Sequence, residues 1–213
     1  MKKAVIFDLD GLIVDSEPLH FKAYREALSI HGAELKKEDY IENWVKLGKG
    51  IKDFINERNL SISPDKVRKE KFRIYEKLIE SELRVFSGAV ELIESLQGKA
   101  ELAIATSSDS KWLKIISKKF NLESKFQLLA SSQGMFPSKP DPSIFLHAAQ
   151  KLNIAPEKCI VLEDAWKGLE AAKRIGMKCI VCPNEFTVNS DFSKADLIVN
   201  SLKELSAEKV LGV

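Results

Sequence analysis

One short stretch near the N-terminus constrains the fold more than any other part of the chain. Residues 5–17 read VIFDLDGLIVDSE, in which three apolar residues run without polar alternation into Asp8. An uninterrupted apolar run is typical of a strand buried on both faces of a parallel sheet. Asp8 and Asp10 then stand at the carboxyl end of that strand, where open α/β sheets bind their ligands.

The spacing of the two aspartates predicts that their side chains lie on the same side of the strand, because side chains alternate along a strand. Two carboxylates so close together repel each other unless a cation lies between them. Mg²⁺, a hard cation that prefers oxygen ligands, meets this requirement. The alternative is a structural turn, because two acidic residues followed by a glycine such as Gly11 also occur in turns that bind no metal. The motif alone therefore leaves a metal site and a structural loop both open.

The composition excludes several classes of function. The 213 residues are 45% hydrophobic and 30% charged, with a net charge of +2 and with Lys and Glu mixed along the chain. We therefore expect neither a nucleic-acid nor a membrane partner. No apolar run is long enough to span a bilayer, and we expect no signal peptide before the first strand. The expectation is a cytoplasmic monomer that acts on a small molecule.

The three cysteines, Cys159, Cys179 and Cys182, form no disulfide framework, which favours a reducing compartment. Cys179 and Cys182 make a CxxC, the spacing of many redox and zinc sites. Here the pair flanks two apolar residues of a predicted strand, and no His or second CxxC accompanies it. We interpret these cysteines as core side chains.

Two kinds of pattern divide the chain. Residues 17–83 show helical periodicity without a convincing strand, and the helices predicted after the one that Ser16 caps cover 37–45, 51–59 and 64–83. From Ser87 onward, helices and apolar strands alternate. The strands are predicted at 102–105, 127–130, 159–162, 180–182 and 197–199, and the helices at 88–96, 111–120, 142–152 and 166–174.

This alternation predicts an α/β protein with a Rossmann-like parallel sheet covered on both faces. The helical stretch is predicted to be a separate, all-helical domain inserted after the first strand. The boundaries expected are 1–15 and 85–213 for the sheet domain and 16–84 for the insertion.

Polar groups follow three further strands of the predicted sheet. Thr106 and Ser107 come after one strand, just before a helix, and Glu163 and Asp164 come after the most hydrophobic one. Lys139 lies in a loop that two prolines restrain. Each signal has a plain alternative, since Ser108 or Asp109 could simply cap the helix and a loop lysine is usually solvated. Together they supply what phosphoryl transfer needs, namely a metal site, a nucleophile and positive groups for the phosphoryl oxygens.

At this point the chain resembles the haloacid dehalogenase superfamily of phosphohydrolases, in the branch that includes β-phosphoglucomutase and small sugar phosphatases. The resemblance rests on four ordered motifs that span the sheet domain. They are DLDGLIVDSE at 8–17, ATSS at 105–108, SKPDPSIF at 138–145 and EDAWKGLEAAKRIGM at 163–177. Residues 17–83 correspond to the cap domain of that branch.

The resemblance implies a role for each matching residue. Asp8 would attack phosphorus and become an aspartyl phosphate, and Asp10 would protonate the leaving oxygen and then activate water. The phosphoryl group would be held by Thr106, Ser107 and Lys139. The expected Mg²⁺ ligands are Asp8, the backbone carbonyl of Asp10, and Asp164, with Glu163 supporting the shell through water. Ser138, Ala165 and Ser87 depart from the family pattern, but none of these departures removes a catalytic group.

The cap leaves the substrate open. His20 and Lys71 fall where the mutases place substrate and hinge contacts, whereas Ile51 stands where mutases use an arginine to hold a second phosphate. Lys49 or Lys52 would substitute imperfectly, since lysine lacks the bidentate fork of arginine. The prediction is therefore a Mg²⁺-dependent phosphatase of small phosphomonoesters, sugar phosphates in particular.

Several alternatives stay open beside that prediction. The nearest is a mutase of the β-phosphoglucomutase type. More distant ones are a receiver-type phospho-accepting module, which the helical insertion disfavours, and a non-catalytic binding protein, which the intact acidic set disfavours. Trp44 is interpreted either as part of the substrate pocket or as a core side chain of the helical domain.

Overall fold

The computed structural model describes residues 2–213. By its internal contacts the chain divides into two compact units. One, here called the core unit, comprises Met1–Val14 and Val85–Val213, and the other, the helical unit, comprises Asp15–Arg84. The polypeptide therefore leaves the core unit once and returns to it.

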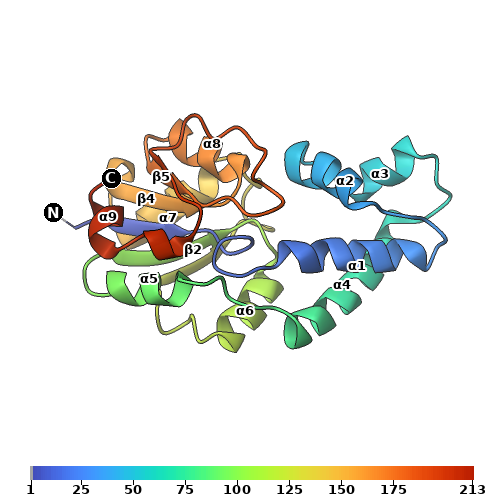
Figure 1. The fold of residues 1–213 in the computed structure, drawn as a ribbon, viewed down its shortest axis with the longest axis horizontal. Helices are drawn as coiled ribbons and strands as arrows, with labels where there is room; N and C mark the ends of the chain where they lie inside the picture. The colour runs from blue at the N-terminus through green and yellow to red at the C-terminus, as the bar shows by residue number, and fades with distance from the viewer. Residues whose placement is uncertain (1) are drawn as a thin grey trace. The chain divides into compact units, whose positions relative to one another are not determined.

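The core unit is built on a parallel sheet whose six described strands lie in the order β3-β2-β1-β4-β5-β6 (Figure 1). The strands are β1 (Ala4–Phe7), β2 (Glu101–Thr106), β3 (Leu128–Ser131), β4 (Cys159–Glu163), β5 (Lys178–Val181) and β6 (Leu197–Ile198). β1 pairs in register with β2 on one side and with β4 on the other. The chain order thus reverses direction at β1, the position where such sheets bind ligands.

Helices cover both faces of this sheet (Figure 1). α7 (Ser143–Leu152) and α8 (Trp166–Arg174) share one apolar cluster with alternate residues of the strands, such as Ile6 and Val161. α5 (Ala89–Leu96) and α6 (Ser110–Lys119) lie on the other side. Every residue of β1 is fully buried, as expected for a central strand sandwiched between two helical layers. The predicted α/β class is therefore confirmed.

The helical unit contains α1 (Glu17–Ser29), α2 (Lys37–Tyr40), a π-helical turn (Ile41–Lys46), α3 (Ile51–Glu57) and α4 (Pro64–Ser81). Its longest helices, α1 and α4, pack against each other, and α3 packs against α4. Inside the unit, the stacked rings of Tyr40 and Trp44 lie 5.6 Å apart, and Phe54 lies 5.4 Å from Trp44.

Several predicted element positions differ from the structure, most of them by one or two residues at an end. The helix predicted at 37–45 is wrong in type, because it changes after Tyr40 into a π-helical turn. The helix predicted at 142–152 starts one residue later, with Pro142 at the N-cap position and an Asp141 oxygen accepting from the Ser143 N–H at 2.9 Å. The C-terminal helix α9 (Ala207–Leu211) was not predicted.

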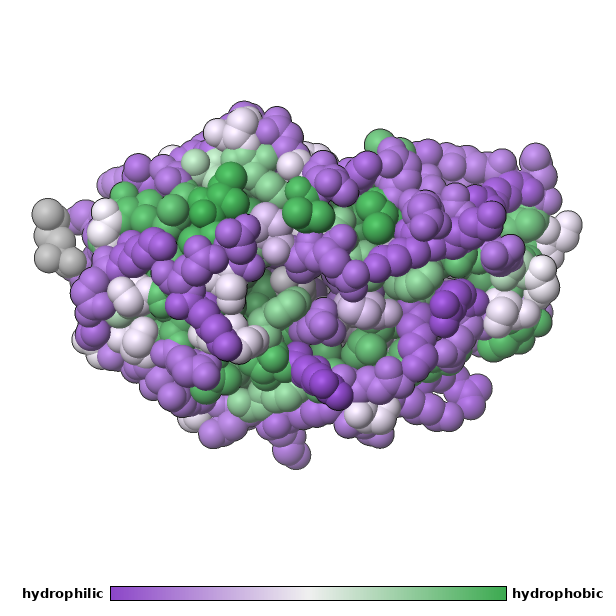
Figure 2. Space-filling view, in the orientation of Figure 1, coloured by the Kyte–Doolittle hydropathy of each residue, from purple (hydrophilic) through white to green (hydrophobic). Residues whose placement is uncertain are grey.

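None of the helices in residues 2–213 combines the length and the apolar character needed to cross a membrane. On the face that Figure 2 shows, hydrophilic side chains are spread over both units and the hydrophobic atoms form separate patches.

Candidate active site

The acidic residues predicted from the sequence meet at one edge of the sheet. Asp8 follows β1, Glu163 ends β4, and Asp164 comes directly after it. Since β1 and β4 are parallel neighbours, their carboxyl ends lie side by side. The backbone N–H of Asp8 donates to the carbonyl of Leu162 at 2.9 Å, which extends the pairing to the site itself.

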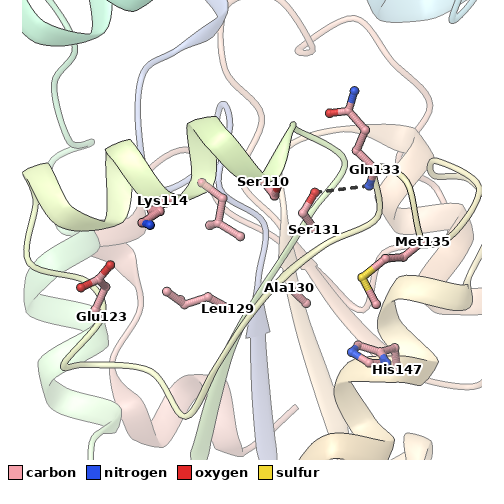
Figure 3. Close-up of a pocket in the computed structure, with 10 residues that line it drawn as sticks. Ser110, Lys114, Glu123, Leu129, Ala130, Ser131, Gln133, Met135 and His147 are labelled. Atoms are coloured by element: carbon pink, nitrogen blue, oxygen red, sulfur yellow. Dashed lines mark hydrogen bonds between the residues drawn. The ribbon is translucent and has the colours of Figure 1, made fainter.

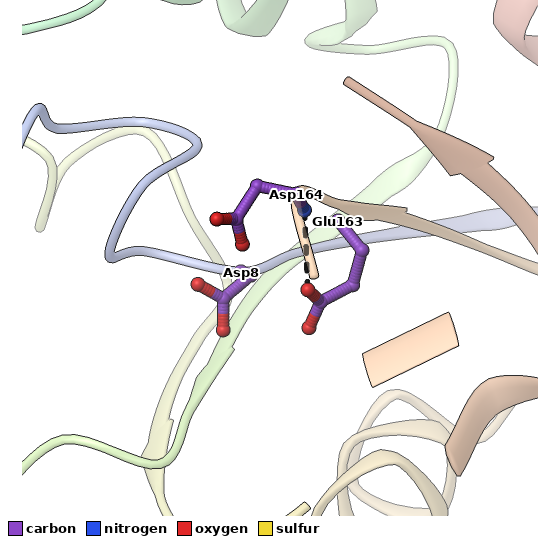
Figure 4. A group of neighbouring side chains, drawn as sticks. All are labelled: Asp8, Glu163 and Asp164. Carbon is purple, nitrogen blue, oxygen red and sulfur yellow. Dashed lines mark hydrogen bonds between the residues drawn. The ribbon is translucent and has the colours of Figure 1, made fainter. Parts of the chain in front are cut away.

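These three carboxylates form a buried cluster (Figure 4). One oxygen from each of Asp8, Glu163 and Asp164 lies within 4.8 Å of those of the other two. Their exposed fractions are 7%, 2% and 4%. Burial of three acids at this separation is unfavourable unless positive charge or donors compensate them.

Lys139 supplies part of that compensation. Its Nζ donates to Asp8 Oδ1 at 2.5 Å, to Glu163 Oε1 at 2.6 Å and to the Ala105 carbonyl at 2.9 Å. Burial alone would lower the pKa of this lysine, but the adjacent carboxylates outweigh it and raise the pKa above its ordinary value. The alternative of a solvated loop lysine is therefore wrong.

One ammonium does not neutralise three carboxylates. Burial raises the pKa of Asp8 to about 8; Lys139 opposes the shift, whereas Glu163 and Asp10 add to it. Asp8 would therefore hold its proton at neutral pH unless further positive charge were present. A hard divalent cation fits this all-oxygen donor set, because it would both occupy the cluster and favour the ionised form of Asp8.

The remaining oxygens of Glu163 and Asp164 have defined partners. Glu163 Oε2 accepts from the backbone N–H groups of Asp164 at 3.1 Å and of Ala165 at 3.2 Å. Asp164 Oδ2 accepts from the side-chain amide of Asn184 at 2.7 Å. Glu163 is thus committed to Lys139 and to the backbone of its own loop, whereas the Asp164 side chain is held by the Asn184 amide.

The residues after β2 lie beside this cluster. Thr106 is 1% exposed, and its hydroxyl donates to Asp10 Oδ2 at 3.2 Å while accepting from the Ser108 N–H at 3.0 Å. The Ser107 hydroxyl oxygen accepts from the backbone N–H of Lys139 at 3.3 Å. These bonds bring the loops that carry Asp10, Thr106 and Lys139 together at one edge of the sheet.

The N-cap residue of α6 is neither Thr106 nor Ser107. An Asp109 oxygen accepts from the Lys111 N–H at 2.7 Å, and Asp109 occupies the N-cap position. Of the two residues considered for this cap, Asp109 fills it, and the hydroxyls before it remain available to other partners.

Two residues of the site were missed. Asn184 lies in the loop after β5, and Gly168 lies in α8. A Cβ on Gly168 would come within 1.8 Å of Glu163 Oε1, so this glycine makes room for the carboxylate. The sequence carried a signal for Asn184, because it is a polar residue near the carboxyl end of a strand in the same sheet. Nothing in the sequence indicated that Gly168 touches Glu163.

The cap residues predicted to contact substrate all lie in the helical unit, where the structure pairs two of them. Lys71, 4% exposed, places its Nζ 2.8 Å from Nδ1 of His20, and the His20 ring stacks on Tyr75 at 4.1 Å. Lys49 forms an ion pair with Glu57 at 2.7 Å. Lys52 is exposed.

Ile51 is buried inside the helical unit, whereas Trp44 is half-buried against aromatic neighbours. Ile51 is 1% exposed at the start of α3, and Trp44 stands among Tyr24, Tyr40 and Phe54. A charged side chain at position 51 would therefore enter an apolar core. The substitution Ile51→Arg would test stability rather than phosphate binding.

A separate hollow of about 650 Å³ lies between β3, α6 and α7 (Figure 3). The described residues that line it include Lys114, Glu123, Ser131, Gln133 and His147. None of the predicted site residues is among these lining residues, so this hollow is distinct from the carboxylate cluster.

A family model described as haloacid dehalogenase-like hydrolase matches residues 5–182. The chain belongs to this family. The haloacid dehalogenase-like match runs from β1 to the end of β5 and therefore includes all four motifs that suggested it. The chain is a hydrolase of this family by sequence as well as by fold.

Similar proteins from bacteria agree with this assignment. Hexitol phosphatase B of Escherichia coli K12 is 30% identical over 98% of this chain and 96% of its own. The phosphorylated carbohydrates phosphatase of Thermotoga maritima is 31% identical over 84% and 83%. The crystal structure of CbbY from Rhodobacter sphaeroides in complex with phosphate is 27% identical, with a TM-score of 0.86 and full coverage of both chains.

Proposed function

We propose that this protein is a Mg²⁺-dependent phosphatase that hydrolyses small phosphomonoesters, sugar phosphates in particular, through an aspartyl phosphate on Asp8. The observation that carries the proposal is the buried cluster of Asp8, Glu163 and Asp164 with the Lys139 ammonium against it. Such a concentration of charge at a ligand-binding sheet edge is costly to stability, which is typical of a site kept for chemistry.

Asp8 is the proposed nucleophile and Asp10 the proposed acid and base. A carboxylate oxygen of Asp8 forms a bond to phosphorus while the bond from phosphorus to the sugar oxygen breaks, and Asp10 gives that oxygen its proton. Water then attacks the aspartyl phosphate, loses a proton to Asp10 and releases inorganic phosphate. The Thr106 hydroxyl, bonded to Asp10 at 3.2 Å, orients the Asp10 carboxyl group for both transfers.

The metal site is proposed at the carboxylate cluster. Asp8 and Asp164 would hold Mg²⁺ together with the backbone carbonyl of Asp10, and Glu163 would support the shell. When bound, the cation would neutralise charge on the phosphoryl oxygens. Asp164 is held in place by its neighbours on β4 and by Asn184, so its position does not depend on substrate.

Lys139, Thr106 and Ser107 are the proposed phosphoryl-binding groups. Lys139 already points its ammonium at Asp8, so a phosphoryl group transferred to Asp8 would meet that positive charge. The Ser107 hydroxyl accepts from the Lys139 backbone N–H, and Ser107 lies just before α6, whose first N–H groups favour anions.

The proposed substrate class comes from the relatives, which are named for phosphorylated carbohydrates and hexitols. In this proposal residues 16–84 act as a cap domain that selects the substrate, with His20, Lys49, Lys52 and Lys71 as candidate contacts. Paired inside the helical unit, His20 and Lys71 would offer a preorganised polar group.

The test is a screen of phosphorylated sugars and sugar alcohols in the presence of Mg²⁺, in which the release of inorganic phosphate is measured. Asp8→Asn should reduce turnover to below about one part in a thousand, because an amide does not attack phosphorus. Asp191→Asn, an exposed aspartate of the same unit, is the matched control and should turn over normally. Full activity of the Asp8 variant would exclude this residue as the nucleophile.

The same screen separates a phosphatase from a mutase. With β-glucose 1-phosphate as substrate, inorganic phosphate should form far faster than glucose 6-phosphate. The reason is that the buried Ile51 stands where mutases have an arginine that holds a second phosphate group. Faster interconversion of the two glucose phosphates than phosphate release would make the protein a mutase.

A further inference from the structure

Asn184 comes from a part of the chain that the four family motifs do not include. It lies in the loop after β5, whose neighbour in the sheet is β4. The backbone of this loop is joined to the site, because the Cys182 N–H donates to the Glu163 carbonyl at 2.8 Å. A side chain from this loop therefore starts next to the acidic pair.

The loop itself fixes the Asn184 side chain. Its Oδ1 accepts from the Phe186 N–H at 2.8 Å, and its backbone N–H donates to the Thr187 hydroxyl at 3.0 Å. Phe186 is 4% and Thr187 2% exposed, so both anchors are buried. Because the amide oxygen takes a backbone N–H, the NH₂ group must be at the other end of the carboxamide.

Both N–H bonds of that NH₂ group are directed at the site. One goes to Asp164 Oδ2 at 2.7 Å and the other to the Gly11 carbonyl at 3.1 Å. Gly11 follows Asp10 in the loop after β1, so one carboxamide joins the loops that follow β1, β4 and β5. A neutral donor satisfies one oxygen of Asp164 without adding a positive charge that would compete with a cation.

Gly11 provides an independent observation. Its φ is +80°, and a Cβ there would lie 2.7 Å from the Asn184 nitrogen and 2.4 Å from Asp164 Oδ2. The space that a side chain would fill at position 11 is the space in which Asn184 and Asp164 meet. The glycine of the first motif is thus matched to a residue 173 positions later in the chain.

We propose that Asn184 is a positioning residue of the candidate metal site, which holds the Asp164 carboxylate and ties the Asp8–Gly11 loop to it. The inference rests on the proposed function for the identity of the cation, but not for the tie between the loops. Partners of this kind orient a ligand and typically change metal affinity by about 10- to 100-fold when they are lost.

The test compares Asn184→Asp and Asn184→Ala with the native protein. The aspartate keeps an oxygen for Phe186 but has no donor for Asp164, whereas the alanine loses all three bonds. Asn189→Ala, an exposed asparagine of the same loop, is the matched control. Mg²⁺ alone is titrated calorimetrically without substrate, and kcat and KM are measured at several Mg²⁺ concentrations.

Both Asn184 variants should raise the Mg²⁺ Kd about tenfold or more. Their kcat should recover with added Mg²⁺ while KM at saturating Mg²⁺ stays within twofold, which separates a weakened cation site from a lost substrate contact. The Asn189 variant should match the native Kd within twofold. Native Mg²⁺ affinity in both Asn184 variants would overturn the proposal.

Hydrogen exchange in metal-free protein keeps the two proposals separable. Losing the bond to the Gly11 carbonyl should speed exchange of amides 10–14 about tenfold in Asn184→Ala and not in Asn189→Ala. If the native protein bound no Mg²⁺, the proposed function would fail. Hydrogen exchange would still test whether Asn184 ties the Asp8–Gly11 loop to Asp164. Unchanged exchange at residues 10–14 would overturn that tie.

Discussion

Lys139 is the residue on which the charge balance of the site depends. Its Nζ is buried between Asp8 and Glu163 and is paired with both carboxylates. Removal of one member of a buried ion pair leaves an uncompensated charge, whose cost exceeds the net value of the pair.

Lys139→Ala should therefore lose both turnover and stability. We expect a loss of about 2–4 kcal/mol of transition-state stabilisation and of about 3–5 kcal/mol in the free energy of unfolding. Steady-state kinetics and urea unfolding measure the two. Lys49→Ala breaks the exposed pair with Glu57 and should cost less than about 1 kcal/mol. Equal stability of the two variants would contradict the buried ion-pair network.

Asp196 is a second charged residue, and its pKa makes the stability of the protein depend on pH. Burial on its own would raise its pKa, but hydrogen bonds from Lys173, the Cys179 N–H and Lys178 together outweigh burial and lower the pKa to about 2. The bonds measure 2.8, 2.8 and 3.0 Å. A folded-state pKa below the unfolded value of about 3.8 stabilises the protein above pH 4, and this stability is lost as pH falls toward 2.

Asp196→Asn should accordingly be less stable than the native protein by about 1–2 kcal/mol at pH 7, a value reduced for partial solvent access. The difference should shrink as the pH is lowered from 4 toward 2. Urea unfolding at a series of pH values gives the comparison. A difference that stays constant across this range would mean that the ionised carboxylate is not the stabilising group.

At the level of residues, the strand-end rule predicted the acids and the lysine. Asp8, Glu163 and Asp164 follow apolar strands whose parallel order brings their ends together, and the two prolines near Lys139 indicated a fixed loop. Asn184 was missed because a polar residue in a loop is usually solvated. Its place after a strand was a weak signal, and the hydrogen bonds of its amide to Asp164 and Gly11 are what connect it to the site.

At the level of elements, helix α8 leaves room for the side chain of Glu163 on the preceding strand, β4. Gly168 faces Glu163 so closely that a Cβ would lie 1.8 Å from Oε1 and 1.9 Å from Cδ. Glu163 has no freedom to move aside, because Lys139 and two backbone N–H groups hold its carboxylate. The helix therefore needs a glycine at this position.

Gly168→Ala should destabilise the protein although it lies inside a helix. In an exposed helix the same change gains about 1 kcal/mol, whereas here the clash should reverse the sign. Urea unfolding measures the effect. In a Glu163→Ala background the methyl group finds space, so the penalty of Gly168→Ala should largely disappear in the double-mutant cycle. Strict additivity would mean that Glu163 is not what the glycine avoids.

Element types were predicted best where the pattern was longest. The strands that carry the site and helix α4 were found within a few residues, because burial imposes period 2 or 3.6 on them. The π-helical turn after Tyr40 was not, since apolar spacing does not distinguish such a turn from an α-helix. Helix α9 has only five residues, too few for a periodic signal.

At the level of the whole molecule, binding of a cation should couple to folding. The cluster of Asp8, Glu163 and Asp164 exists only when β1 and β4 are paired, so a cation bound there stabilises the native state alone.

Mg²⁺ at about 100 times its Kd should add about 2.7 kcal/mol to the stability of the core unit, and EDTA should remove it. This corresponds to a rise of about 5–10 °C in the melting temperature of a domain of this size. Differential scanning calorimetry with and without the cation measures the rise. Asp164→Asn should show less of it, and an equal rise in that variant would place the cation elsewhere.

The central position of β1 has a consequence for synthesis on the ribosome. β1 precedes both of its partners in the chain, which begin at Glu101 and Cys159, and the helical unit separates it from them. The nascent chain therefore carries an apolar strand with both edges unpaired while residues 15–84 emerge and pack among themselves. Unpaired strand edges are where nascent proteins associate wrongly. β1 therefore stays unpaired on both sides until β2 has been made, and on one side until β4 has been made.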